Sequence, residues 1–120
     1  MSALDRLIAG RRGLTVIGDI HGDFVQMIAA VEAARGRNHG ILFLGDLVNR
    51  GPYSIPCAAL ARRLVEAGHA LVLPGNHEVR ARLYLQGAAM TDKDRDRSQA
   101  LIREVEADRR ARAELTAFVA

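Results

Sequence analysis

The stretch Leu14-Thr15-Val16-Ile17-Gly18-Asp19-Ile20-His21-Gly22 joins an apolar run to a polar cluster flanked by glycines. Two later stretches have the same arrangement. They are Ile41-Leu42-Phe43-Leu44 with Gly45-Asp46-Leu47-Val48-Asn49-Arg50-Gly51, and Ala70-Leu71-Val72-Leu73 with Gly75-Asn76-His77-Glu78. The apolar runs are continuous rather than alternating, which is typical of strands buried on both faces of a sheet. We therefore predict three parallel strands over residues 14–17, 41–44 and 70–73.

The segments between these runs have the pattern of helices. Residues 24–34 carry apolar side chains at the spacing of one helical face, and Asp23 before them is a suitable N-cap. Residues 55–67 form the second predicted helix, with Ser54 as its expected cap. The order of elements is therefore βαβαβ.

The three polar clusters are expected to converge. Right-handed crossovers point the carboxyl ends of neighbouring parallel strands the same way, and open α/β sheets bind ligands at that edge. Asp19 and His21 lie two residues apart in a glycine-bounded turn, so a carboxylate and an imidazole can reach one cation. The sequence thus predicts a metal site at this edge.

The second and third clusters extend this chemistry to two metals and an anion. Asp46 has two carboxylate oxygens and could bridge two cations about 3.5–4 Å apart, a clamp suited to phosphoryl transfer. Asn76 offers an amide oxygen to the second cation. His77 could act as a general acid for a leaving oxygen, and Arg50 can bind phosphate oxygens with its forked guanidinium group.

These motifs, Gly-Asp-x-His-Gly, Gly-Asp-x-x-x-Arg-Gly and Gly-Asn-His-Glu in this order, resemble those of the calcineurin-like metallophosphoesterases. The endings at Arg50-Gly51 and Glu78 resemble the branch with serine/threonine protein phosphatases, diadenosine tetraphosphatases and bacterial RNA-repair phosphatases. The resemblance implies a metal-bridging hydroxide as nucleophile. It also implies metal ligands and phosphate-handling residues: Asp19, His21 and Asp46 for one metal, Asp46 and Asn76 for the other, and Arg50 and His77 for the phosphate.

The sequence departs from this family in two respects. Asn49 stands where the family usually has an Asp that orients the histidine of the third motif, and an amide stabilises an imidazolium less well than a carboxylate does. The family also takes at least two further histidine ligands from a second half, whereas the resemblance here covers residues 14–86. We do not expect His39, in a turn, or His69, at the far end of a strand, to replace them.

The remainder of the chain is predicted to be mostly helical. Residues 79–86 read as a short helix, 87–91 as a loop, and 94–120 as helix with a possible break in the charged stretch 106–114. We expect residues 1–120 to form one domain, incomplete relative to the family. A truncated fragment and a compact short homologue are the two explanations of its length.

Composition excludes some classes of protein. The chain has 120 residues, 49% of them hydrophobic, and no run approaches the ~18 apolar residues of a membrane span. The start also lacks a hydrophobic signal region, so we expect a cytoplasmic protein. The single cysteine, Cys57, precludes an intrachain disulfide and reads as a packed thiol rather than a nucleophile.

The charge pattern allows two interpretations. The net charge is +3, and all but one of the 17 basic residues are arginine. Many of these lie between Arg80 and Arg112, which could form a surface for nucleic acid. We favour a solvated, ion-paired helix, because acids alternate with these arginines and no aromatic residues interleave to stack bases. The acids are Asp92, Asp94, Asp96, Glu104, Glu106 and Asp108.

Taken together, the residues and the resemblance predict an α/β metallophosphoesterase fold, represented by its N-terminal βαβαβ half and a C-terminal helical segment. The expected activity is hydrolysis of phosphate esters with two divalent ions, Mn²⁺ first, with Fe or Zn²⁺ as alternatives. The substrate is left open among phosphoprotein, dinucleoside polyphosphate, nucleic-acid end and small metabolite. The alternative is a non-catalytic remnant that binds a metal or a partner.

Overall fold

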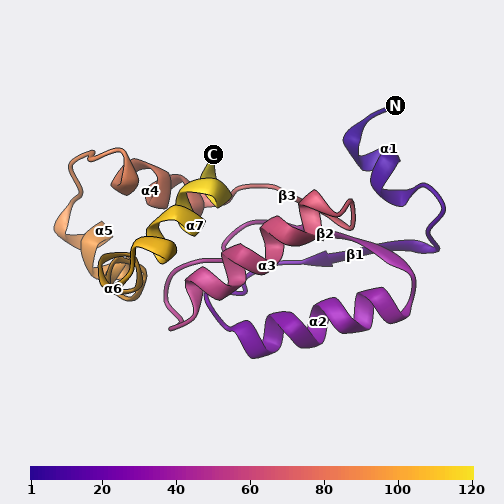
Figure 1. Cartoon of the computed structure of the whole chain (residues 1–120), viewed down its shortest axis with the longest axis horizontal. Coiled ribbons are helices and arrows are strands. Elements are labelled where there is room, and N and C mark those ends of the chain that lie inside the picture. The colour runs from indigo at the N-terminus through magenta and orange to yellow at the C-terminus, as the bar shows by residue number, and fades with distance from the viewer.

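The computed structural model describes all residues from 1 to 120 and contains a parallel sheet of three strands. The strands are β1 (Gly13–Ile17), β2 (His39–Phe43) and β3 (Ala70–Val72), in the spatial order β1-β2-β3 (Figure 1). Ile17 is paired with Phe43 and Phe43 with Val72, so the three strands end at the same level, although β3 begins two residues later than β2. The three predicted parallel strands are confirmed, although β2 and β3 each end one residue before the predicted Leu44 and Leu73, and β2 starts at His39 rather than at Ile41.

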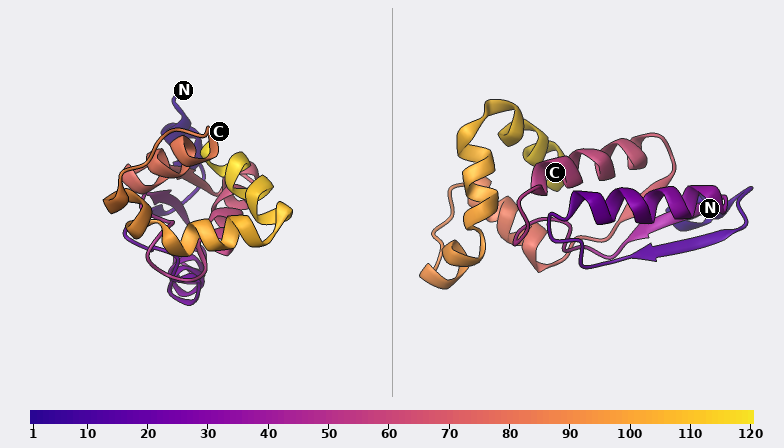
Figure 2. Two further views of the ribbon diagram at one scale, coloured as in Figure 1. Left: turned by 90° about the vertical axis from the view of Figure 1, so that its left-hand side faces the viewer. Right: turned by 90° about the horizontal axis from the view of Figure 1, so that it is seen from below.

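One face of the sheet is covered by α2 (Phe24–Gly36) and α3 (Ser54–Glu66), which lie side by side (Figure 2). Ile17, Ile41 and Phe43 point into this layer and are buried with Met27 of α2. Asp23 caps α2 as predicted, because its carboxylate accepts a hydrogen bond from the Gln26 N–H at 3.1 Å. This layer is the main core.

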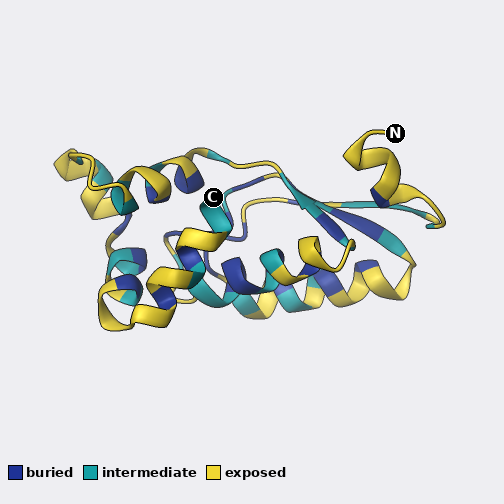
Figure 3. Ribbon diagram, turned by 45° about the horizontal axis from the view of Figure 1, so that its top comes forward, coloured by how far each residue is buried: buried dark blue, intermediate teal, exposed yellow.

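The opposite face of the sheet is largely open, contrary to the prediction of burial on both faces. Val16, Leu44 and Leu73 follow the opposite alternation and are 52%, 50% and 53% exposed. The short helix α1 (Ala3–Ile8) covers only the far end of this face, where Leu7 packs closely on Gly40 of β2 (Figure 3). Continuous apolar runs therefore predicted the strands but not how much of each is covered.

The cap of α3 differs from the predicted one. Ser54 is the first residue of the helix rather than its cap, and Tyr53 at the cap position makes no side-chain hydrogen bond to it. The backbone N–H groups of Ser54 and Ile55 instead donate to the Glu104 carboxylate, both at 3.1 Å. A residue about fifty positions away thus satisfies the first N–H groups of α3, which have no partner inside the helix.

Four further helices lie beyond the carboxyl ends of the strands (Figure 1). They are α4 (Asn76–Leu85), α5 (Asp92–Arg97), α6 (Gln99–Ala107) and α7 (Arg109–Val119). The predicted break is present, at Asp108, whereas the helical region starts at Asp92 rather than at residue 94, and α4 starts at Asn76 rather than at residue 79. α7 packs on α3 and α4 and forms a second apolar cluster with Val48 and Leu101.

The predicted ion pairing of the C-terminal helices is mostly wrong. Among the acids named above, only Asp94 forms an ion pair, with Arg80 at 3.4 Å. Glu104 is used as a helix cap, and Glu106 accepts a hydrogen bond from the Tyr84 hydroxyl. The closest ion pair joins Arg62 of α3 to Glu114 of α7 at 2.6 Å. The closest ion pair therefore links α7 to α3 and does not lie within the C-terminal helices.

Three smaller predictions can also be compared with the structure. His39 opens β2 rather than lying in a turn, and its ring bonds the Thr15 hydroxyl at 2.9 Å. Cys57 is fully buried in the core, as expected of a packed thiol. None of the helices is both long enough and apolar enough to span a membrane.

Candidate metal centre

The loops after β1 and β2 are hydrogen-bonded to each other along their length. The N–H groups of His21 and Gly22 donate to the carbonyls of Asp46 and Leu47 at 2.8 and 2.9 Å, and Gly51 N–H donates to His21 O at 2.6 Å. Gly22 has a φ of +75°, and a Cβ there would lie 2.7 Å from the Gly51 carbonyl oxygen. Glycine is therefore needed at this approach, and it holds the two predicted clusters together.

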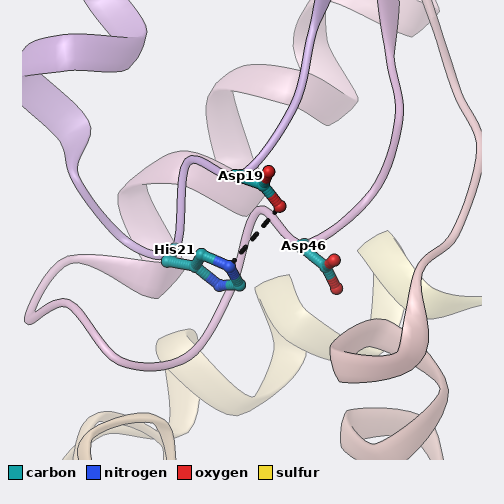
Figure 4. Close-up of side chains that lie close together, drawn as sticks. All are labelled: Asp19, His21 and Asp46. Carbon is teal, nitrogen blue, oxygen red and sulfur yellow. Dashed lines mark ion pairs between the residues drawn. The ribbon is translucent and has the colours of Figure 1, made fainter.

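Asp19, His21 and Asp46 form a candidate metal-binding group at the joined loops (Figure 4). One ligand atom from each lies within 4.8 Å of the others, and His21 Nε2 is 3.7 Å from Asp19 Oδ1. All three residues have a left-handed backbone, with φ between 48° and 55°. Residues other than glycine rarely adopt this backbone conformation, and strained residues of this kind are concentrated at functional sites.

The donor set of this group suits a divalent transition metal. Two carboxylates and one imidazole match Mn²⁺, Fe and Zn²⁺, whereas imidazole is a poor ligand for Mg²⁺. The Asp19 side chain is 84% exposed and the His21 side chain 17%, so one side of the group is open to solvent. A bound ion could therefore also contact water or substrate.

Asp46 connects this group to the third motif. Its Oδ1 accepts a hydrogen bond from the His77 N–H at 3.4 Å, and a Cβ at Gly75 would lie 2.6 Å from the same oxygen. The Asn76 side chain, by contrast, is exposed and makes no hydrogen bond, although it begins α4 beside the group. Thus Asp46 lies against the start of α4, whereas the Asn76 amide is not joined to the cluster.

Glu78 holds the Asp46 loop in place. Its carboxylate accepts hydrogen bonds from the N–H groups of Gly75, Asp46 and Leu47 at 3.0, 2.5 and 3.1 Å. Burial raises the pKa of Glu78, although the backbone hydrogen bonds oppose this. Glu78 is therefore both a first-turn residue of α4 and a support of the loop that carries Asp46.

His77 is buried beside Asn49. The amide Nδ2 of Asn49 lies 3.3 Å from His77 Nδ1 and 3.4 Å from the hydroxyl of Ser98, between α5 and α6. The His77 and His21 rings meet edge to face with centroids 5.0 Å apart. Burial lowers the pKa of His77, the charges of His21, Arg80 and Arg50 act in the same direction, and Asp46 opposes them. His77 is therefore favoured in its neutral form.

Asn49 itself is fully buried, and its Oδ1 has no hydrogen-bond partner. The expected contact between Asn49 and the motif-three histidine is thus present, made through the amide nitrogen. Ser98 is the further member of this network. Ser98 and Asn49 are 49 residues apart in the chain, so no local sequence pattern indicated this contact.

Arg50 follows directly and is exposed, with a φ of +71°. It makes no ion pair with Asp5 or any other acid. Its guanidinium group therefore remains available to an anion.

Comparison with known proteins agrees with this arrangement. Residues 14–112 match the calcineurin-like phosphoesterase family, beyond the end of the predicted resemblance at residue 86. The chain is 36% identical over 96 residues to a symmetrical bis(5'-nucleosyl)-tetraphosphatase of Chromohalobacter salexigens, covering 78% of this chain and 33% of that protein. It is 30% identical over 82 residues to the asymmetrical bis(5'-nucleosyl)-tetraphosphatase PrpE of Bacillus velezensis, covering 60% of this chain and 33% of that protein.

A relative of another kind is the serine/threonine-protein phosphatase 2B catalytic subunit A1 of Saccharomyces cerevisiae. This chain is 32% identical to it over 81 residues, covering 65% of this chain and 15% of that protein. The matches thus span about a third or less of the length of these relatives. The family match covers most of the chain and includes all three motifs. This chain belongs to the calcineurin-like phosphoesterase family.

Proposed function

We propose that this chain is a metal-dependent phosphoesterase that hydrolyses phosphate ester bonds. The convergence of Asp19, His21 and Asp46 on one point is the observation that carries the proposal. Family membership supports it, because the matched residues 14–112 include both of the joined loops. A divalent ion held there would supply an activated water nucleophile and neutralise charge on a phosphoryl group.

We assign the metal ligands as the motifs suggest. Asp19, His21 and Asp46 hold one ion, and Asp46 and Asn76 contribute to a second. The exposed Asn76 amide is free of other hydrogen bonds and can turn toward that second ion. Mn²⁺ is the metal we favour, with Fe or Zn²⁺ as alternatives, and we place the protein in the cytoplasm.

The remaining residues of the site handle the phosphate. Arg50 binds phosphate oxygens, since its guanidinium group is exposed and unpaired. His77 faces the leaving oxygen: with Asn49 donating to Nδ1, the proton of the neutral ring lies on Nε2, which can donate a hydrogen bond. Asn49 holds this tautomer.

Among the possible substrates, we favour dinucleoside polyphosphates, because the names of the tetraphosphatase relatives specify them. Phosphoproteins follow, from the likeness to the yeast protein phosphatase, and nucleic-acid ends and small metabolites have less support. The alternative function is a binding remnant without turnover. The amide in place of a carboxylate at Asn49 favours that alternative.

The test is hydrolysis of p-nitrophenyl phosphate by the metal-stripped chain before and after addition of Mn²⁺. Asp46→Asn should abolish Mn²⁺-dependent turnover and also the rise in melting temperature that Mn²⁺ causes in the unaltered chain. Asp92→Asn, a matched change in an exposed residue of α5, should affect neither. Turnover that survives in Asp46→Asn would refute the assignment. A thermal shift without turnover would favour the binding remnant.

A further inference from the structure

A group of arginines adjoins the candidate metal centre. An open hollow of about 390 Å³ lies between the loop after β2 and the corner of α5 and α6. Three arginines line it, and none of them forms an ion pair. The lining consists of Arg50, Asp96, Arg97, Gln99, Ala100 and Arg103.

Residues next to these arginines hold the backbone around the hollow in place. Ser98, next to Arg97, is buried and bonds the side chain of Asn49, the residue before Arg50. Glu104, next to Arg103, caps α3 at the end of the same loop. Each of these two arginines, Arg97 and Arg103, is therefore adjacent to a residue anchored on the segment from Asn49 to Ile55, which contains Arg50.

The charge of the hollow selects an anion. The lining contains three guanidinium groups and one carboxylate, that of Asp96. This carboxylate accepts a hydrogen bond from the Gln99 amide at 3.5 Å. Guanidinium groups bind phosphate oxygens through pairs of parallel hydrogen bonds. No aromatic side chain lines the hollow to stack a base. The lining thus fits phosphate groups better than nucleobases.

We propose that Arg50, Arg97 and Arg103 form a second anion site that binds the non-reacting phosphates of a substrate carrying two or more linked phosphates. The proposal rests on the proposed function for the position of the reacting phosphate at Asp46. Arg50 belongs to both sites, since it lies on the loop that begins at Asp46 and also lines the hollow. The site distinguishes a phosphate chain from a simple monoester.

The experiment measures binding of inorganic tripolyphosphate and orthophosphate to the full, metal-free chain by calorimetry, with the chelator dialysed away because it is itself an anion. We expect tripolyphosphate to bind at least about tenfold more tightly than orthophosphate. Arg97→Gln and Arg103→Gln should each weaken tripolyphosphate binding about five- to tenfold, as expected for loss of a charge-assisted contact at a partly solvated site. Circular dichroism verifies that each variant is folded.

Arg95→Gln is the matched control, because Arg95 lies on α5, is exposed and does not line the hollow. It should change the affinity less than twofold. Equal losses in all three variants would show a general charge effect and overturn the proposal, as would equal affinities for the two anions. The measurement needs neither metal nor turnover. Binding that depends on Arg97 and Arg103 would therefore stand even if hydrolysis failed, and its absence beside intact hydrolysis would overturn the second site alone.

Discussion

Replacing Glu78 by alanine removes one side chain that accepts hydrogen bonds from four backbone N–H groups of the site loops. These are the N–H groups of Gly75, Asp46, Leu47 and Val48, at 2.5 to 3.4 Å. Glu78 is 3% exposed, so water cannot readily take its place. A hydrogen bond to a charged acceptor is worth ~1.5–3 kcal/mol, but burying the carboxylate offsets part of this. We therefore expect about 1 kcal/mol for each of the three shorter bonds, little from the longer bond to Val48, and about 3 kcal/mol in total.

The assay is urea unfolding of the metal-free chain followed by circular dichroism, which gives the change in the free energy of unfolding. Glu78→Gln keeps one acceptor oxygen but brings an amide NH₂ group against N–H donors, so its loss should be intermediate. Glu32→Ala is the matched control, because Glu32 is exposed on α2 and makes no side-chain hydrogen bond or ion pair. A Glu78→Ala variant no less stable than Glu32→Ala would refute the view that this carboxylate holds the Asp46 loop.

Two further predictions concern buried side chains of the core and the site. Burial raises the pKa of Cys57 from 9.0 to about 12, so fewer than about one thiol in a thousand is ionised at pH 8, and a thiol reagent should label the chain only after unfolding. Rapid labelling of the native chain would contradict this packing. Asn49→Asp places a carboxylate beside His77 and should raise the pKa of that ring, which burial now lowers, by about 1 to 3. Nuclear magnetic resonance titration of the metal-free chain follows the ring protons, and an unchanged midpoint would show that the two side chains do not interact.

The parts of the fold that sequence reasoning predicted depend on short-range patterns. The apolar runs before Asp19 and Asp46 indicated two strands, and their parallel order followed from helical spacing in the segments between them. Once that topology was known, the meeting of Asp19, His21 and Asp46 followed from the geometry of parallel sheets. The cap of α2 at Asp23 was likewise a local signal.

The parts that sequence reasoning missed depend on contacts between residues far apart in the chain. Ser54 is of a residue type that often caps helices, but the N–H groups at the start of α3 donate to the Glu104 carboxylate instead. The alternating acids and arginines between Arg80 and Arg112 suggested pairing along a helix, yet the strongest pair reaches from Arg62 to Glu114. A local sequence pattern does not specify the angle at which a helix packs on its neighbours. That angle determines which charged side chains come close enough to pair.

The contacts made by the C-terminal helices explain why those helices matter to the site. Ser98 meets Asn49 behind the His77 ring, and Glu104 fixes the end of the loop that begins at Asp46. A change in the packing of α6 would therefore move Asn49 and the start of α3, and Arg50 lies between these two points. The family match ends at residue 112, within α7, so the matched segment includes both anchors. We infer that the α5–α6 corner is part of the functional unit, because without it the N-terminus of α3 would lose the Glu104 carboxylate and the buried Asn49 would keep only its contact with His77.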